Sequence, residues 1–356
     1  MIPFLEKKIN KIKLTLTTKC NLSCPYCFVK KTNKDMDWDT AKRAVDILIN
    51  SIGKEKLLSM YGGEPLINYD LIKKILPYSD KVAKKNKKNL TISICTNTML
   101  LDREHVDLFN RYNVRVVASL AGQKEQHNRE RILKDRTGTY DLVVKKLNIL
   151  KSRTKKGNLG ISFCLFPDNV CDLYKNFLYL VKSGFNHINF EIIRDYKIWG
   201  DKDIMIFIFQ YKKIVRHILS ELRNNNYIFI NPINWELRTR MLSNKLCPFN
   251  YLMEVYPGGD VAFSPFLLNK SNKEDYILAN IRKGKIYRLG ECSFSFNDRC
   301  FKCRSAYFKK YKSDVAADLL HKFYDDISLV GVNYILKNAN KKQFKNYISK
   351  AKKICF

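Results

Sequence analysis

Apolar and polar residues alternate with two different periods along roughly the first 225 residues of this 356-residue chain. Short runs such as IKLTLTT, residues 12–18, alternate apolar and polar side chains as strands do. Longer runs such as residues 37–52 carry apolar residues three and four positions apart, as helices do. The two kinds of run follow one another about six times. Such a series predicts parallel strands joined by crossover helices.

The expected strands lie at residues 12–18, 57–61, 90–97, 114–122, 159–166 and 188–194, and the expected helices at 37–52, 69–86, 103–113, 140–157, 171–184 and 204–226. About six strand and helix units favour an α/β fold, built as a partial (β/α)6 barrel of the TIM type, over a closed barrel of eight. In such folds the chemistry lies on the loops that follow the carboxyl ends of the strands.

The regular alternation ends with the last of these helices, which predicts a domain boundary near residue 225. Beyond it, a PGGD turn and widely separated cysteines indicate a small, loop-rich unit that needs a metal to hold it. The predicted organisation is a core domain at 1–225, a small cysteine-containing domain at 226–312 and a basic helical tail at 313–356.

The chain carries a formal net charge of +31, from 65 basic and 34 acidic residues. Such a charge suits a polyanionic partner such as nucleic acid, an anionic membrane surface or an acidic peptide. Lysine, asparagine and isoleucine are abundant along the whole chain, however, which indicates genomic base composition rather than one selected patch. We favour that second interpretation, and nucleic acid is the weaker partner hypothesis.

Two absences in the sequence bear on its location. No apolar run approaches the roughly 20 residues that span a bilayer. The first 13 residues, MIPFLEKKINKIK, contain no apolar segment leading to a cleavage site. We therefore expect a cytoplasmic protein with no transmembrane segment.

The eleven cysteines are poor candidates for disulfide bonds in such a protein, because cytosolic thiols are kept reduced. Clustered cysteines are then expected to bind metal. One group is Cys20, Cys24 and Cys27, which directly follows the first expected strand, and a second lies near residues 292–303. The scattered cysteines are expected to be buried or inert: Cys95, Cys164, Cys171 and Cys355.

Three thiols on one short loop can hold three corners of a cubane iron-sulfur cluster. The absence of a fourth cysteine leaves one iron open for a substrate or cofactor to chelate. Structural zinc is the alternative, but it normally takes four closed ligands, and no histidine or fourth cysteine lies near Cys20, Cys24 and Cys27. We therefore expect a 4Fe-4S cluster at this loop.

The pattern Cys20-x3-Cys24-x2-Cys27, with the aromatic Tyr26 before the last cysteine, resembles the signature of the radical S-adenosylmethionine (radical SAM) superfamily. The segment YGGEPL, residues 61–66, resembles the glycine-rich segment of that superfamily. The resemblance implies that the open iron binds S-adenosyl-L-methionine. It also implies that a backbone segment holds the methionine amino group of this cofactor: Gly62, Gly63, Glu64 and Pro65.

Two further segments extend the resemblance. ICTNTMLL resembles a fourth-strand segment that places Thr96 and Asn97 near the cofactor, with Thr98 in place of a usual glycine. Residues 117–141 resemble the peptide- and protein-modifying branch, which implies that Ser119 and Arg131 contact the ribose or carboxylate of the cofactor. Ala121 stands where that branch often has aspartate. The ordinary alternative for Ser119 and Arg131 is a helix cap and a surface charge.

The second cysteine group resembles the auxiliary-cluster extension called SPASM, or its shorter twitch form. This resemblance implies a second 4Fe-4S cluster with four thiolate ligands: Cys247, Cys292, Cys300 and Cys303. Ser264 stands where the longer form has a cysteine, so two auxiliary clusters are not expected. Four thiolates also suit structural zinc, and the two metals remain alternatives here.

The resemblance implies an enzyme in which one electron from the cluster cleaves S-adenosylmethionine, and the 5'-deoxyadenosyl radical then takes a hydrogen atom from the substrate. The branch implies a peptide or protein substrate, as for a maturase, with a reductant such as flavodoxin or ferredoxin. A radical SAM enzyme acting on RNA or another polyanion is the second hypothesis. A non-catalytic metal-binding module is the third. The sequence does not identify a catalytic residue, the substrate or the bond that changes.

The last part of the chain is strongly basic. Residues 337–353 contain seven lysines and no acid, with apolar residues at helical spacing among them. We expect a helix that docks the substrate or a partner. The alternative is a solvated helix that packs through its apolar residues, which are Ile335, Leu336, Phe344, Tyr347 and Ile348.

Overall fold

The computed structural model describes residues 9–154, 157–193, 196–231, 233, 252–262, 277–286 and 330–352. These ranges form one sheet with the strand order β11-β10-β9-β8-β1-β2-β3-β4-β5-β6-β7. The first seven strands are β1 (Lys11–Thr17), β2 (Glu55–Gly62), β3 (Asn89–Thr96), β4 (Arg115–Ser119), β5 (Leu159–Leu165), β6 (His187–Ile192) and β7 (Phe229–Ile230). The last four are β8 (Leu252–Val255), β9 (Asp260–Ala262), β10 (Ala279–Asn280) and β11 (Lys285–Ile286).

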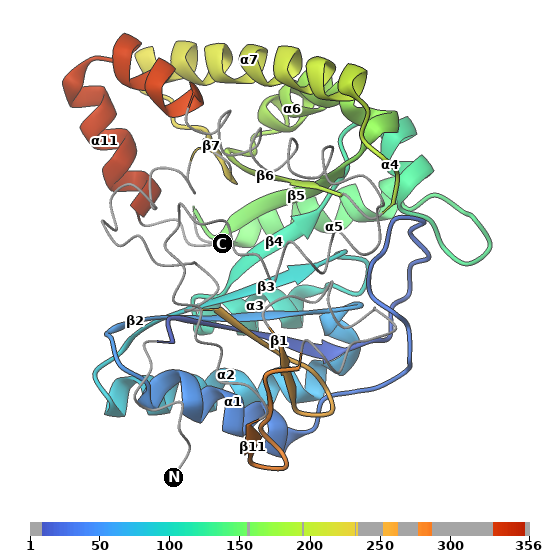
Figure 1. Cartoon of the computed structure of the whole chain (residues 1–356), viewed down its shortest axis with the longest axis vertical. Coiled ribbons are helices and arrows are strands. Elements are labelled where there is room, and N and C mark those ends of the chain that lie inside the picture. Colours follow the sequence, from blue (N-terminus) through green and yellow to red (C-terminus); the bar gives the residue numbers. More distant parts are fainter. Residues whose placement is uncertain are drawn as a thin grey trace.

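Strands β1 to β7 are parallel, and crossover helices join β1 to β6 in sequence (Figure 1). The helices are α1 (Trp38–Asn50), α2 (Tyr69–Lys85), α3 (Arg103–Arg111), α4 (Lys124–Glu130), α5 (Tyr140–Arg153), α6 (Leu173–Lys182), α7 (Asp201–Arg223) and α11 (Lys341–Lys352), with short 3-10 helices η1 (Pro65–Asn68) and η2 (Pro167–Asp172). The strand order has two ends, so the barrel is open. The expected α/β fold with six strand and helix units is confirmed.

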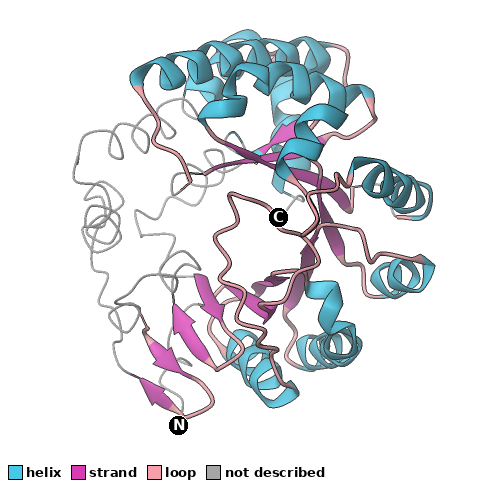
Figure 2. Ribbon diagram, turned by 90° about the vertical axis from the view of Figure 1, so that its right-hand side faces the viewer, coloured by secondary structure: helices cyan, strands magenta, loops and turns pink. Residues whose placement is uncertain are grey.

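The sheet curves, and its helices lie on the outer side of the curve (Figure 2). We call that side the helix-covered face and the opposite side the concave face. Alternate strand residues such as Leu14, Met60, Phe163 and Phe190 are fully buried beneath the helices. The ring of Phe190 lies 6.0 Å from that of Phe163 and 6.3 Å from that of Tyr211 in α7. Burying each such side chain contributes about 1.5–3 kcal/mol, so this face holds the main core.

The concave face takes the residues in between, and most of them are polar. Lys13 is the Cα partner of Ser59, which is the partner of Ser93, across β1, β2 and β3. The Ser93 hydroxyl donates to the Ser59 hydroxyl oxygen at 3.0 Å. On β5 and β6, the same face carries Cys164 and its Cα partner Glu191. A polar inner surface is typical of a ligand site rather than of a packed core.

The predicted boundary near residue 225 falls where the sheet changes character. Beyond α7, β8 pairs in parallel with β1, and β9, β10 and β11 follow as antiparallel strands. These strands, β7 and the seven-residue α4 are absent from the sequence prediction. The domain limits themselves stay a prediction, because most of residues 234–329 lies outside the described ranges.

The basic tail is helical, as expected. Residues 330–338 form one helix, and α11 follows after a break at residues 339–340. Tyr347 of α11 is fully buried, with its hydroxyl donating to the carbonyl oxygen of Ile228 at 3.0 Å and its ring 5.0 Å from that of Phe229. The tail therefore packs beside β7 through its apolar side, and a role in docking a partner stays a prediction. Within the described part of the chain, no helix has the length and apolar character needed to cross a membrane.

Candidate functional site

The three cysteines of the first group lie on one loop that directly follows β1. We call residues 18–34 the cysteine loop. The backbone N–H of Cys27 donates to the carbonyl oxygen of Cys24 at 3.1 Å, and the N–H of Leu22 points at the Cys20 sulfur at 3.4 Å. The Cys27 side chain is exposed, and those of Cys20 and Cys24 are half-buried. The thiols are therefore within reach of a bound group.

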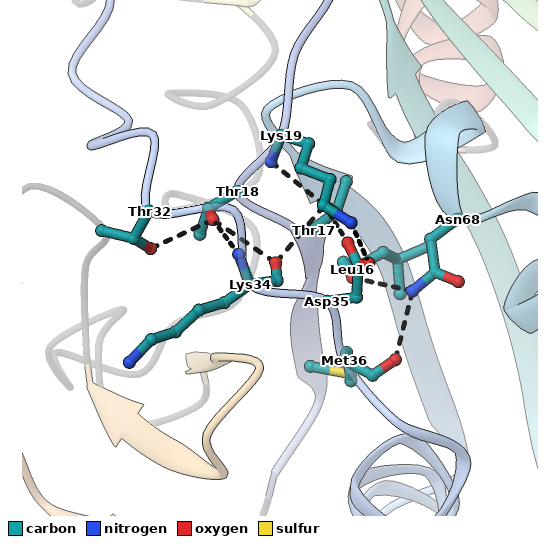
Figure 3. A network of polar contacts seen from close by, with 9 residues as sticks. All are labelled: Leu16, Thr17, Thr18, Lys19, Thr32, Lys34, Asp35, Met36 and Asn68. Atoms are coloured by element: carbon teal, nitrogen blue, oxygen red, sulfur yellow. Dashed lines mark hydrogen bonds and ion pairs between the residues drawn. The ribbon is translucent and has the colours of Figure 1, made fainter.

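The cysteine loop is tied together at its base (Figure 3). The N–H of Thr18 donates to the carbonyl oxygen of Lys34 at 2.9 Å, and the N–H of Lys34 donates to the Thr18 hydroxyl at 2.9 Å. The Asn68 amide donates to the carbonyl oxygens of Leu16 and Met36, at 3.0 and 3.1 Å. These bonds hold the start and the end of the loop side by side at the carboxyl end of β1.

Two glycines, the last residue of β2 and the one after it, let the next segment pack against this base. The N–H of Gly63 donates to the carbonyl oxygen of Thr17 at 2.8 Å. A Cβ atom would lie 2.3 Å from the Thr17 oxygen at Gly62, whose φ is +144°, and 2.1 Å from the Lys19 oxygen at Gly63. Such contacts are far too short for any side chain. The glycines are thus needed for backbone packing against the cysteine loop, in addition to any approach of a cofactor.

Glu64 joins the ends of β2 and β3. Its carboxylate is fully buried and accepts hydrogen bonds from the Thr96 hydroxyl at 2.7 Å, the Asn97 N–H at 2.7 Å and the Leu66 N–H at 3.1 Å. Burial raises the pKa of Glu64 to about 7, while these hydrogen bonds act in the opposite direction. Both carboxylate oxygens are engaged by the protein, so Glu64 positions the segment that ends in Pro65.

Asn97 connects β3 to the cysteine loop. Its side-chain amide donates to the Asn21 side-chain oxygen at 2.7 Å and lies 3.9 Å from the Cys20 sulfur. The next residue, Thr98, has a φ of +67°, a left-handed conformation that is rare for a β-branched residue. Glycine adopts this conformation without strain. This gives a physical reason why the family segment that position 98 resembles usually has glycine where this chain has Thr98.

Tyr26 and Arg131 meet on the concave side of the cysteine loop. Tyr26 packs against Phe166, Cys24 and Cys164, and the Arg131 guanidinium carbon lies 5.8 Å from the centre of its ring. The Tyr26 hydroxyl and the Arg131 Nε are buried, and neither has a hydrogen-bond partner among the described residues. An unsatisfied buried polar group costs about 1–3 kcal/mol. These two atoms therefore fit a bound polar ligand beside Cys24.

A buried histidine holds the Arg131 backbone in place. The Ala121 N–H donates to His127 Nδ1 at 3.3 Å, and His127 Nε2 lies 3.1 Å from the Thr139 hydroxyl, which donates to the Arg131 carbonyl oxygen at 2.9 Å. Burial lowers the pKa of His127 to about 3, and the Arg131 charge adds to this. The ring is neutral and bonded on both nitrogens. Ser119 is also buried nearby in the chain, at the end of β4.

Glu130 and Asn169 complete this corner and are absent from the sequence prediction. The Asn169 amide donates to Glu130 Oε1 at 2.7 Å and to the Cys164 carbonyl oxygen at 3.0 Å. Within the described ranges the other Glu130 oxygen has no hydrogen-bond partner. Burial raises the pKa of this carboxyl to about 7, while Asn169, Arg131 and Gln126 act in the opposite direction. The spacing of 39 residues between Glu130 and Asn169 carries no sequence signal.

The residues present fit a cubane cluster better than a single metal ion. Within the described ranges, no three His, Cys, Asp or Glu side chains converge on one ion. A cubane takes each thiolate on a different iron, so separated thiols on one loop suit it. Burial raises the pKa of Cys20 to about 11, and a bound metal reverses that preference by ligating the thiolate.

The structure brings most of the predicted site residues together at the carboxyl ends of β1, β2 and β3. Direct contacts link Gly63 and Glu64 to the base of the cysteine loop, Thr96 and Asn97 to Glu64, and Arg131 to Tyr26. Ser119 is placed at the end of β4, where its side chain is buried. The second group lies outside the described residues: Cys247, Cys292, Cys300, Cys303 and the substituted Ser264.

Comparisons with known proteins agree with this geometry. Residues 14–178 match the Radical SAM superfamily model. An uncharacterised protein of Methanocaldococcus jannaschii is 31% identical over 185 residues, which are 52% of this chain and 63% of that protein. The radical SAM cyclopropyl synthase TigE of Paramaledivibacter caminithermalis is 25% identical over 194 residues, 48% of this chain and 40% of that protein. The chain thus spans less than two thirds of the length of these relatives.

Solved structures share the fold. A structure of anSMEcpe with bound AdoMet superposes with a TM-score of 0.73 at 20% identity, over 95% of this chain and 98% of that one. The same protein with bound AdoMet and the Cp18Cys peptide gives a TM-score of 0.70 at 20% identity, over 98% of this chain and 99% of that one. At this identity the likeness shows the fold alone.

Proposed function

We propose that this protein binds a 4Fe-4S cluster through Cys20, Cys24 and Cys27 and uses it to cleave S-adenosyl-L-methionine, since residues 14–178 match the Radical SAM superfamily model. The observation that carries the proposal is the arrangement of the cysteine loop. Its base is bonded to the glycine segment after β2, and Asn97 bonds to it from β3. Three thiols therefore lie where chemistry is expected in an open α/β barrel.

The chemistry that these cofactors supply is one-electron cleavage of S-adenosylmethionine and abstraction of a hydrogen atom from the substrate. The chain's own residues bind and orient. Gly62 and Gly63 present bare backbone, and Glu64 fixes that backbone against β3. The unsatisfied Arg131 Nε and Tyr26 hydroxyl offer hydrogen bonds to a polar part of the cofactor. Tyr26, Phe166 and Ile193 form an apolar wall that excludes water from this side.

The substrate that we favour is a peptide or protein side chain, modified as by a maturase with a flavodoxin-like or ferredoxin-like reductant. The support is the resemblance of residues 117–141 to the peptide-modifying branch and the fold shared with a protein solved with a bound peptide. The small domain at 226–312 would hold an auxiliary 4Fe-4S cluster through its four cysteines, with zinc as the alternative metal. Ser119 is proposed as a further contact to the cofactor.

The central test replaces Cys20, Cys24 and Cys27 together with Ala. Anaerobically reconstituted variant protein should lose one cluster's iron and all 5'-deoxyadenosine formation, because each thiolate holds one corner of the cluster. Cys171→Ala is the matched control, since this exposed thiol belongs to η2 and not to the cysteine loop. Turnover in the triple variant would refute the proposal.

The second metal is tested separately. The unsubstituted protein should hold about eight irons per chain if both sites carry 4Fe-4S cubanes. A Cys300→Ala, Cys303→Ala variant should keep the first cluster and lose the second, because two remaining thiolates cannot close a cubane. Stoichiometric zinc with one cluster's iron in the unsubstituted protein would instead favour the zinc alternative.

A further inference from the structure

The charged side chains on the concave face include Lys13, Glu254, Glu191 and the buried Arg131 beside Tyr26, and the first two form an ion pair. The Lys13 ammonium on β1 lies 2.8 Å from Glu254 Oε1 on β8. The Tyr256 hydroxyl donates to the other Glu254 oxygen at 3.3 Å. Lys13 also lies 4.4 Å from the centre of the Tyr61 ring. This pair is satisfied by the protein, so it leaves no net charge for a ligand.

Glu191 differs from the other three because its side chain is exposed. It is the residue before the last of β6, and its neighbours Ile188 and Phe190 point to the helix-covered face. The side chain of Glu191 therefore lies on the concave face. It forms no ion pair with any residue in the described ranges. Its charge contributes to raising the pKa of Lys13, so the two side chains interact at longer range without forming an ion pair.

Glu191 is one strand away from the candidate cofactor site. Its Cα partner on β5 is Cys164, and Cys164 packs beside Tyr26 and Cys24. Next to Cys164 stand the unsatisfied, buried Tyr26 hydroxyl and Arg131 Nε. A group bound by Glu191 would thus sit beside the place where the radical is expected.

The electrostatic reach of Glu191 agrees with an inward orientation. Burial raises the pKa of Cys95 to about 11 and that of Cys164 to about 12. The Arg131 charge opposes both shifts, and the Glu191 carboxylate is a smaller contribution that raises both pKa values. These two thiols stand on β3 and β5, on either side of β4. A carboxylate that acts on both strands faces the interior of the open barrel.

We propose that Glu191 is a specificity residue that binds a cationic side chain of the peptide substrate, a lysine ammonium or an arginine guanidinium, next to the residue that is modified. A carboxylate recognises such a group by a charge-assisted hydrogen bond. The inference rests on the proposed function for its substrate class. Binding of the cation itself does not require the cofactors.

The test uses three probe peptides that differ only at their centre: acetyl-Gly-Gly-Lys-Gly-Gly-amide and its norleucine and glutamate counterparts. Their dissociation constants are measured by ligand-observed NMR on the full-length reconstituted protein at about 50 mM ionic strength, where screening is moderate. The lysine peptide should bind about tenfold more tightly than the norleucine peptide, a difference of about 1.4 kcal/mol. Glu191→Gln should remove this preference.

Two further variants separate the site from general charge. Glu191→Lys should reverse the preference toward the glutamate peptide, which a merely unfolded or loosened protein would not do. Glu55→Gln is the matched control, because Glu55 is an exposed strand residue at the amino-terminal end of the sheet. It should keep the lysine preference and the 5'-deoxyadenosine formation of the unsubstituted protein.

Equal affinity of the unsubstituted protein for the lysine and norleucine peptides would overturn the inference. So would a lysine preference that survives in Glu191→Gln, or one that is lost in Glu55→Gln. Failure of the proposed function gives a different result, namely no 5'-deoxyadenosine from the unsubstituted protein. A lysine preference that depends on Glu191 would then still establish the cation site.

Discussion

Phe190 and Glu191 are neighbours in β6, yet Phe190 is fully buried beneath α7 and Glu191 is exposed on the concave face. The same contrast recurs in β1, where Leu14 is fully buried and Lys13 pairs with Glu254. The two faces of one sheet are thus built from alternate residues of the same strands. The helix-covered face holds the fold together, while the concave face and the loops at its carboxyl-terminal edge carry the groups that can meet a ligand.

The largest effect is expected when one side chain on each face of β6 is truncated, because this tests the contrast between the helix-covered face and the concave face directly. Phe190→Ala should lower the free energy of unfolding by about 3–5 kcal/mol, because it empties a fully buried position among aromatic rings. Asn189→Ala, on the concave face, should cost less than about 1 kcal/mol. Urea unfolding followed by circular dichroism measures both. Similar losses for the two variants would mean that the faces do not differ as described.

A smaller effect is expected from the buried acid Glu130, whose pKa is about 7 against an ordinary value of 4.5. A carboxyl with a raised pKa stabilises the fold at low pH, and this contribution is lost as pH rises through about 7. Between pH 4 and 8, Glu130→Gln should therefore gain up to about 3 kcal/mol relative to the unsubstituted protein. Urea unfolding at several pH values measures this change. Parallel curves for the two proteins would contradict it.

The next test concerns the carboxyl-terminal edge. Gly63→Ala should cost about 1–3 kcal/mol and lower the iron bound on reconstitution, because the new Cβ would meet the Lys19 oxygen at the base of the cysteine loop. Gly258→Ala is the control, since its Cβ would meet nothing within 4 Å. Thermal unfolding and iron analysis provide the readouts. Full iron content in Gly63→Ala would show that the glycine is not needed for this packing.

The smallest effect is expected at Thr98. Thr98→Gly should change the free energy of unfolding by no more than about 1 kcal/mol, because relief of the left-handed strain offsets the lost side chain and the greater freedom of glycine. Thr91→Gly, in the ordinary extended backbone of β3, should cost more although Thr91 is less buried. Denaturant unfolding of both variants decides the matter. A larger loss at Thr98 would show that its side chain outweighs the strain.

The order of strands and helices could be predicted because each of the six units repeats its pattern over several turns or several strand positions. Strands β7, β10 and β11 have two residues each, which is too short for any period to register. The cysteine loop could also be predicted, since its residues are adjacent in the sequence. Long-range polar partners could not, as Asn169 and Glu130 show.

For some residues the structure adds contacts that the sequence does not indicate. The sequence assigns Glu64 to the cofactor segment, and the structure shows that its carboxylate is bonded to Thr96 and Asn97 from the next strand. Gly62 and Gly63 likewise face protein backbone at a distance that excludes a side chain. Sequence patterns indicate which residues belong to a site. They do not indicate which neighbours each residue contacts, because those contacts form between strands that are far apart in the sequence.

The hydrogen bonds at the base of the cysteine loop affect the order in which the protein folds and binds its cluster. Closing a flexible loop costs conformational entropy. Here hydrogen bonds made by Thr18, Lys34 and Asn68 offset that loss without a bound metal. In a zinc finger, by contrast, metal binding and folding are one event. We therefore expect the barrel to fold first. The cluster would then bind to a cysteine loop whose two ends are already held in place. Disrupting the base, as in Asn68→Ala, should slow cluster loading more than it lowers the final amount loaded.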